Sequence, residues 1–381
     1  MKRHVPHIRP WLAAILVMLL ALSACDLNGG SSKTVTPPHP KNAQTTPSAT
    51  SIQLGVQPCP DAVKAAAHWN NIVNPTSSQK VEGVVCGYLM GVSSLQAVVK
   101  VRSAGNDQLL DIAVYTAITS AHPSQIFGLK GLRYGEVSFS NYNTLLTMEI
   151  DLSAHQSHIQ HDLYREFKWS DSAGTLAQVP FVGLYPDMTR YQAEVAQSEV
   201  NTGQNSQPWR LSAVTTAQNF AEFELGWNPA APTTVVSGGG THDAQAVILV
   251  MNPSVSNATI KLSLSRLELN TNGGIWEVTG VATDGMTITS SQNAQQLTSP
   301  VQVTGGNTAF AGKPTTIIIF DQDHTQMSQA LSVSGRAQFS ASVSYTSNFQ
   351  GEAEEGIIAL YTYSGNQVIV GATMVKVLLS A

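Results

Sequence analysis

Hydrophobic and polar residues alternate through much of the chain after residue 54, and this two-residue period predicts a mainly β protein. The clearest example is Gln338–Thr346, in which Phe339, Ala341, Val343 and Tyr345 share one face and Ser or Thr residues occupy the other. Such alternation is typical of an antiparallel strand that has one buried face and one solvated face.

Six further runs in the last part of the chain predict strands, and Gly-, Pro- and Asp-rich turns separate them. These runs are Thr287–Ser290, Val301–Thr304, Thr315–Phe320, Leu331–Ser334, Gly356–Tyr363 and Thr373–Leu379. About seven short strands in roughly 95 residues are typical of an immunoglobulin-like β-sandwich, which we expect over residues 286–381.

Two segments of this region resemble a known family. Ile288–Gly305 (ITSSQNAQQLTSPVQVTG) has a Ser-Pro pair before a V-x-V-x-G strand, and Phe339–Gly365 (FSASVSYTSNFQGEAEEGIIALYTYSG) precedes a hydrophobic last strand. Both segments are similar to the bacterial spore-germination immunoglobulin-like domain, over about a quarter of the chain. The resemblance implies a binding or architectural module at the end of an exported lipoprotein, without catalytic residues, and a link to sporulation or germination.

Residues 186–285 are expected to form a smaller α+β unit. Asp187–Val200 predicts a helix capped by Asp187, and Leu211–Trp227 predicts an amphipathic helix. Three predicted strands follow: Ala244–Met251, Thr259–Leu269 and Gly274–Val281. Two helices before an antiparallel meander resemble the NTF2/cystatin-like folds.

Residues 54–185 are expected to form a strand-rich N-terminal domain that begins with a helix over Asp61–Val73. Its predicted strands are Leu95–Val101, Leu109–Tyr115, Gln125–Leu129, Glu136–Phe139, Leu145–Ile150 and Leu163–Trp169.

The first 24 residues have the features of an export signal. Lys2, Arg3 and Arg9 precede an apolar run of 12 residues, Trp11–Leu22, which is too short to span a bilayer permanently. Leu-Ser-Ala-Cys, ending at Cys25, resembles the lipobox of bacterial lipoproteins, which implies cleavage before Cys25 and its lipidation. Acyl chains on Cys25 would hold the protein to a membrane, facing outside or the periplasm. The alternative is an ordinary signal peptide with a nearby cysteine.

Residues 25–53 are expected to form a lipidated, disordered tether. This stretch is rich in Gly, Ser, Thr and Pro and has no apolar period. A flexible chain of this length would reach roughly 30 Å from the membrane.

Charge and cysteine content narrow the function further. Without its first 24 residues the chain has 17 basic and 25 acidic residues and no later Lys/Arg run, which argues against nucleic acid as a partner. Cys59 and Cys86 are the two cysteines after Cys25. In an exported chain they predict a disulfide, with two unrelated buried thiols as the alternative.

Catalytic and metal-binding motifs are not found, so we predict a protein that is not an enzyme and holds no cofactor or metal. His155, His158 and His161 recur every third residue, a spacing that would spread them around a helix rather than bring them to one metal. Asp321, Asp323 and His324 suit a hairpin turn better than a cation loop, because they lack the remaining ligands of a calcium site.

Tyr185, Asp187, Arg190 and Tyr191 form a dense polar and aromatic segment that could line a ligand groove. The alternative is the start of a helix with buried aromatic residues on either side.

These features together favour a membrane-anchored envelope lipoprotein whose ectodomain binds cell-wall polymer or another envelope protein. A second hypothesis is a small-ligand carrier that uses the α+β unit. A third is an envelope hydrolase in which two of Asp111, Glu136, Glu149 and Asp151 pair, although these residues also fit solvent-facing strand positions.

Overall fold

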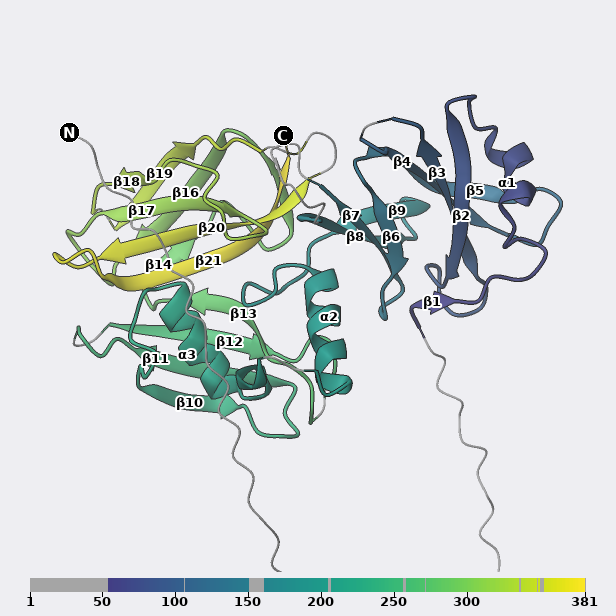
Figure 1. Ribbon diagram of the computed structural model, residues 1–381. Coiled ribbons are helices and arrows are strands. Elements are labelled where there is room, and N and C mark those ends of the chain that lie inside the picture. The colour runs from purple at the N-terminus through teal and green to yellow at the C-terminus, as the bar shows by residue number, and fades with distance from the viewer. Residues whose placement is uncertain are drawn as a thin grey trace, which may run out of the picture. The chain divides into compact units, whose positions relative to one another are not determined.

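Two antiparallel sheets form the N-terminal part of the protein, as the computed structural model shows (Figure 1). The structure describes residues 54–381 except 106, 151–160, 205–206, 256–257, 271, 336, 348, 350–352 and 381, and these described residues belong to one compact unit. The signal segment, Cys25, the tether, Asp151, His155 and His158 therefore lie outside the described residues.

The first sheet has the strand order β1-β2-β3-β4-β5 and the second has the order β6-β7-β8-β9. The strands of the first sheet are β1 Val56–Gln57, β2 Gln79–Gly87, β3 Gln96–Ser103, β4 Leu110–Thr116 and β5 Ser124–Leu132. Those of the second are β6 Glu136–Phe139, β7 Thr144–Glu149, β8 Leu163–Ser170 and β9 Thr175–Val179.

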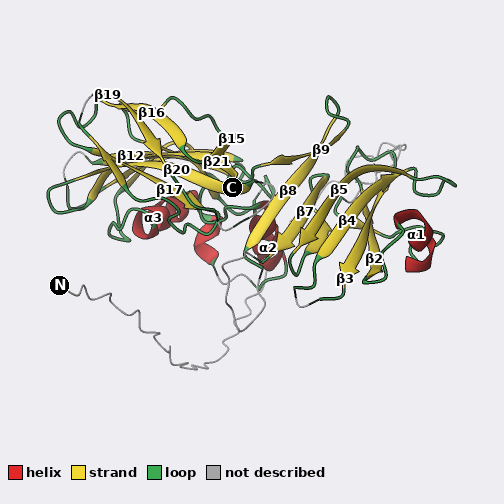
Figure 2. Cartoon of the chain, turned by 90° about the horizontal axis from the view of Figure 1, so that it is seen from above, coloured by secondary structure: helices red, strands yellow, loops and turns green. Residues whose placement is uncertain are grey.

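Alternating side chains give the first sheet two buried faces. Val98 and Ile112 point toward the second sheet, where they pack with Leu145 and Phe167. The neighbouring residues on the strands point the other way, toward helix α1 (Ala66–Val73), whose Trp69 is fully buried. Figure 2 shows α1 beside the first sheet, on the side away from β7 and β8.

The remaining strands form a nine-stranded sheet and a three-stranded sheet. The nine-stranded sheet has the order β10-β11-β12-β13-β21-β20-β17-β18, with β15 parallel to β21. Its strands are β10 Thr233–Gly238, β11 Gln245–Met251, β12 Thr259–Ser265, β13 Glu277–Ala282, β15 Gln295–Thr298, β17 Thr315–Asp321, β18 Leu331–Val333, β20 Glu354–Tyr363 and β21 Ile369–Ser380. The three-stranded sheet has the order β14-β16-β19, with β14 Met286–Ile288, β16 Val301–Asn307 and β19 Gln338–Val343.

The two ends of the nine-stranded sheet are covered differently. Helix α3 (Ala213–Phe223) packs on β10–β13 through Ala217 and Phe220, after the short 3-10 helix η1 (Pro208–Leu211). At the other end the three-stranded sheet packs face to face on β17, β20 and β21, with Val303 and Ile358 among the core residues. The last part of the chain therefore contains a second β-sandwich.

The two ends of the large sheet are joined directly. Val281 of β13 pairs with Met374 of β21, and one continuous core contains residues from both sides of residue 285. The predicted boundary at 285/286 thus lies within a region of shared sheet and core.

The fold class is mainly β, as predicted, with three α-helices among the described residues. The predicted starts of two helices are wrong, since α1 begins at Ala66 rather than Asp61 and α2 (Arg190–Asn201) begins after Thr189 rather than at Asp187. Asp187 does not cap α2, because the capping residue is Thr189, whose side chain accepts from the backbone N–H of Gln192 in a reciprocal capping box.

Candidate functional site

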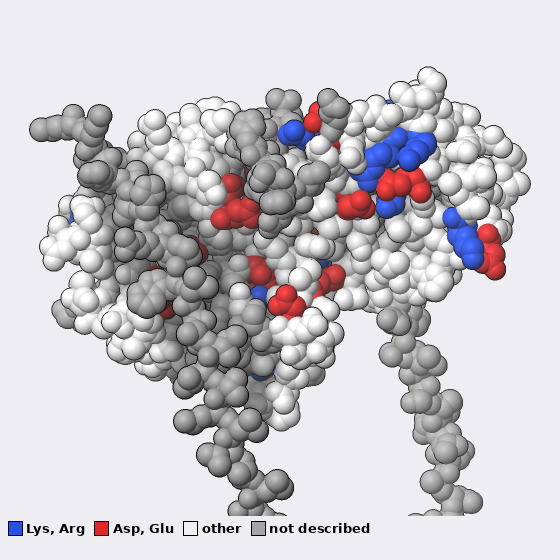
Figure 3. All heavy atoms as spheres, viewed as in Figure 1, with Lys and Arg blue, Asp and Glu red and all other residues white. Residues whose placement is uncertain are grey.

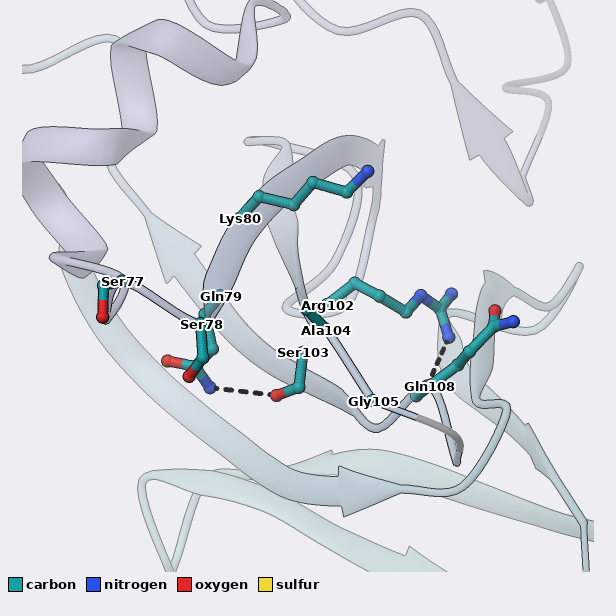
Figure 4. Close-up of a pocket in the computed structure, with 9 residues that line it drawn as sticks. All are labelled: Ser77, Ser78, Gln79, Lys80, Arg102, Ser103, Ala104, Gly105 and Gln108. Atoms are coloured by element: carbon teal, nitrogen blue, oxygen red, sulfur yellow. Dashed lines mark hydrogen bonds between the residues drawn. The ribbon is translucent and has the colours of Figure 1, made fainter.

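A polar hollow of about 410 Å³ opens at the end of the first sheet, where β2 begins and β3 ends (Figure 4). Its volume lies within the range of small-molecule sites. The lining contains hydroxyl, amide and basic side chains and no carboxylate, and consists of Ser77, Ser78, Gln79, Lys80, Arg102, Ser103, Ala104, Gly105 and Gln108.

Strand pairing places the polar residues of the hollow in two cross-strand pairs. Gln79 lies opposite Ser103, and Lys80 lies opposite Arg102. Residues directly opposite one another share a face of the sheet and successive residues alternate, so Lys80 and Arg102 leave one face while Gln79 and Ser103 leave the other, and the hollow wraps around the end of the strands. Two like charges in this arrangement destabilise a sheet unless other charges compensate them.

Arg102 is held in place by four acceptors. Its Nε donates to Glu82 Oε2 at 2.7 Å and its Nη1 to the carbonyl oxygen of Gln108 at 3.0 Å. Its Nη2 donates to the carbonyl oxygen of Gly135 at 3.0 Å and to Glu136 Oε1 at 3.3 Å. The side chain is only 12% exposed, so the guanidinium is a fixed positive charge beside the hollow.

The nearby charges do not cancel. Lys100 shares the two carboxylates of Arg102, with its Nζ 3.4 Å from Glu136 and 4.0 Å from Glu82. Lys80 is exposed, and no described residue forms an ion pair or hydrogen bond with its ammonium. Three cations thus face two carboxylates. Figure 3 shows Lys and Arg side chains gathered beside Asp and Glu over the N-terminal strands, on a face that is otherwise largely uncharged.

A second hollow, a groove of about 630 Å³, adjoins the first and shares Gln79 with it. It runs from the end of α1 across the outer face of β4 and β5, which the short helix leaves uncovered. Its polar lining residues are Asn74, Thr76, Gln79, Asp111, Tyr115, Gln125 and Lys130.

Asp111 is the one carboxylate of the groove, and both of its oxygens accept hydrogen bonds from the fold. Oδ2 accepts from Gln79 Nε2 at 2.9 Å and Oδ1 accepts from the backbone N–H of Gly131 at 2.8 Å. The hydroxyl of Tyr115 donates to Gln125 at 3.5 Å, and burial raises the pKa of Tyr115. The groove therefore offers a ligand amide and hydroxyl groups together with the ammonium of Lys130.

The other predicted acids have separate roles. Glu136 belongs to the Lys100–Arg102 network, whereas Glu149 forms a buried pair with Arg165, whose Nε donates to it at 3.0 Å. Burial raises the pKa of Glu149, and Arg165 opposes this effect. Asp111, Glu136 and Glu149 thus each have different partners.

The four residues of the predicted ligand groove each have separate partners in the fold. Tyr185 lies in the core against Phe220 and Trp209, with its backbone bridged to Val278. Asp187 forms a buried ion pair with Arg210. Arg190 contacts Glu166 and Glu268, and Tyr191 stacks on Tyr164 with ring centroids 4.8 Å apart.

These contacts belong to a connecting segment, Phe181–Arg190, which leads from the N-terminal sandwich into α2. Lys376 of β21 donates to the carbonyl oxygens of Gly183 and Met188, and its partner Glu355 accepts from the backbone N–H of Phe181. The backbone N–H of Asp187 donates to Glu277, which also pairs with Arg210. Buried charges therefore fix this segment on the nine-stranded sheet.

The remaining sequence predictions concern turns and cysteines. Asp321 Oδ1 accepts from the backbone N–H groups of Asp323 and Thr325, which confirms the predicted turn, and His324 lies 3.2 Å from Glu224. His161 Nε2 lies 2.9 Å from the carbonyl oxygen of Tyr134. Cys59 and Cys86 form the predicted disulfide.

Searches for two other kinds of feature found none within the described part of the chain. No group of three or more His, Cys, Asp or Glu residues is arranged to hold a metal ion. No described helix has the length and apolar character needed to cross a membrane.

Sequence reasoning missed Gln79, Lys80 and Arg102 as site residues because it did not predict strand β2. The usable signal was the pair of charged positions in Lys80-x-Glu82 and Lys100-x-Arg102, at period two within apolar runs. It also missed Arg210, Glu277, Glu355 and Lys376, since no sequence spacing links these ion-pair partners.

No family model matches the chain, and a search of curated proteins finds no match.

Proposed function

We propose that the protein is a cell-envelope lipoprotein, anchored through Cys25, whose ectodomain binds cell-wall polymer at the groove of the N-terminal sandwich. The observation that carries the binding proposal is this groove of about 630 Å³, which crosses an outer sheet face and is lined by amide, hydroxyl and ammonium groups. Wall polymers are chains of sugars and peptides, whose hydroxyl and amide groups pair with such side chains.

The state of Asp111 favours binding over hydrolysis. Hydrolysis of a glycosidic bond typically uses a pair of carboxyl groups, whereas Asp111 is the one carboxylate that lines the groove, and its two oxygens accept hydrogen bonds from Gln79 and Gly131. The carboxylate is therefore suited to orienting Gln79 at the junction of the two hollows.

The resemblance of the last part of the chain supports an envelope role. The sandwich built by β14–β21 is compatible with an immunoglobulin-like domain of the spore-germination type, and we propose that it serves as a structural module. By the same resemblance we propose a role in sporulation or germination. The α3-covered part of the large sheet would be an NTF2/cystatin-like unit, whose core contains the fully buried side chains of Phe220 and Trp276.

Binding is tested with the mature chain, residues 25–381, made soluble by Cys25→Ser. Gln125→Ala and Lys130→Ala each remove an exposed polar group from the groove, so we expect both to reduce retention on purified cell-wall sacculi. Gln302→Ala, at an exposed position on β16, is the matched control. Wild-type protein that does not sediment with sacculi, or groove variants that bind like the control, would contradict the proposed site.

The anchor is tested separately by labelling cells with palmitate. We expect wild-type protein to carry label and to fractionate with membranes, and Cys25→Ala to do neither. A Cys25→Ala protein that still incorporates palmitate would refute the lipidation proposal.

A further inference from the structure

We propose that the hollow of Figure 4 is an anion-binding subsite, which takes a phosphate or carboxylate group of the polymer held in the adjoining groove. This inference rests on the proposed function and specifies the chemistry of the ligand. Its starting point is Lys80, which lies opposite Arg102 on the adjacent strand and, unlike Arg102, has no carboxylate partner among the described residues.

The charges around the hollow favour an anionic ligand. Glu82 and Glu136 are both used by Arg102 and Lys100, which leaves the ammonium of Lys80 without a carboxylate partner among the described residues. No acidic residue lines the hollow either. An anion placed there would meet one fixed cation and one flexible cation, and would relieve the repulsion between them.

The hollow also contains a hydrogen-bond donor for an anion. Ser103 Oγ accepts from Gln79 Nε2 at 3.5 Å, so its own hydroxyl hydrogen is free to donate into the hollow. Gln79 in turn is oriented by Asp111, with its Oε1 accepting from Thr76 Oγ1 at 3.1 Å. The hollow therefore combines a hydroxyl donor from one face of the sheet with basic side chains from the other, and both kinds of group bind phosphate and carboxylate oxygens.

The groove and the hollow meet at Gln79, which lines both of them, so a polymer held in the groove reaches the edge of the hollow. The amide and hydroxyl side chains of the groove would bind the repeating hydroxyl or amide groups, and the hollow would select chains that carry negative charge. The subsite would thus supply specificity for anionic polymers, and its contribution to the binding affinity should decrease as the salt concentration rises.

The test measures binding of the soluble mature chain to three immobilised polymers: poly(glycerol phosphate), polyglucuronate and dextran. We expect one or both anionic polymers to bind and dextran to bind more weakly. Lys80→Glu should reduce the affinity for the anionic polymers about tenfold at low salt, because it replaces an attraction by a repulsion. Lys313→Glu, which makes the same charge change outside both hollows, should leave the affinity within about twofold of the wild type.

The outcomes separate the sources of the anion and the two proposals. If only the binding of poly(glycerol phosphate) depends on Lys80, the subsite takes phosphodiesters. If only the binding of polyglucuronate depends on Lys80, the subsite takes carboxylates. Equal affinities of Lys80→Glu and Lys313→Glu, or no binding of either anionic polymer, would overturn the subsite. If sacculi binding still depends on Gln125 and Lys130, the proposed function survives that result. Conversely, a protein that binds an anionic polymer through Lys80 but does not bind sacculi would support the anion subsite and contradict the cell wall as the source of the polymer.

Discussion

The charges of the connecting segment and those beside the hollow are arranged in opposite ways. Around Phe181–Arg190, each cation is buried against carboxylates, as Lys376 is against Glu355 at 3.0 Å with side-chain exposures of 3% and 1%. Beside the hollow, Lys80 is exposed and lies opposite another cation. The first arrangement minimises uncompensated charge inside the fold, whereas the second keeps one cation available at the surface.

This difference separates residues that hold the fold from residues that we assign to a ligand. A buried ion pair destabilises strongly when one partner is removed, because the other charge is then left in a poorly solvated site. Lys80, by contrast, is exposed and lies opposite a cation that already has carboxylate partners, so replacing it should change the stability little and in the stabilising direction. Mutations in the two regions should therefore differ in the sign of their effect on stability.

The largest effect is expected for Arg210→Ala, which leaves Glu277 fully buried and Asp187 largely buried without their cation. Burial and the charge of Asp187 raise the pKa of Glu277 well above its ordinary value, and Arg210 opposes both. We expect a loss of about 3–5 kcal/mol in the free energy of unfolding, measured by urea denaturation. Arg133→Ala, whose partner Asp107 is exposed, is the control and should cost less than about 1 kcal/mol. Equal losses in the free energy of unfolding for the two variants would contradict the proposed difference between buried and exposed charges.

The next effect concerns the covalent constraint on β2, the strand that contains Lys80. The disulfide joins Cys59 to Cys86 across 27 residues. Its removal by Cys59→Ser and Cys86→Ser together should lower the free energy of unfolding by about 3 kcal/mol, because the unfolded chain gains entropy. Urea denaturation of the double variant measures this loss. Unchanged stability would mean that the fold of this region does not depend on the disulfide.

The next effect is the pH dependence of stability that arises from Glu268, the partner of Arg190 in the connecting segment. Burial raises the pKa of Glu268 to about 7, although Arg190 lies 2.6 Å away and acts in the opposite direction. The folded protein then holds a proton that the unfolded chain releases near the ordinary value of 4.5. Stability from this group is therefore lost as the pH rises from about 4.5 through about 7.

Between pH 5 and pH 8 the free energy of unfolding should therefore fall less in Glu268→Gln than in the wild type, by on the order of 1–3 kcal/mol. Thermal unfolding at each pH measures this difference. The pKa of Glu355, also raised by burial to about 7, leaves a residual slope of the same sign in the variant. A variant with the same pH profile as the wild type would show that Glu268 does not titrate in this window.

Strand periodicity allowed much of the fold to be predicted, and its failures have physical causes. Glu136–Phe139 was predicted with its observed bounds because it alternates cleanly. Strand β2 was missed because its run QKVEGVVCG contains a bulge between Val81 and Gly83, which breaks the two-residue period. Helix α2 starts later than predicted because Thr189, rather than Asp187, meets the capping geometry with Gln192.

The candidate site was harder to predict because strand pairing creates it. Lys80 and Arg102 are 22 positions apart in the sequence and become neighbours only through the register of β2 and β3. Asp111 could be identified as a polar strand residue, yet its bonds to Gln79 and Gly131 depend on tertiary structure. Composition and periodicity carry no information about such contacts.

The most direct test of the account is the thermal stability of Lys80→Glu, measured together with its affinity for the anionic polymers. Replacing a cation opposite Arg102 by a carboxylate turns a repulsion into an attraction worth roughly 0.2–1 kcal/mol. We therefore predict an unchanged or slightly raised Tm together with the loss of polymer binding. A lowered Tm with unchanged binding would contradict the account, because Lys80 would then serve the fold and not a ligand.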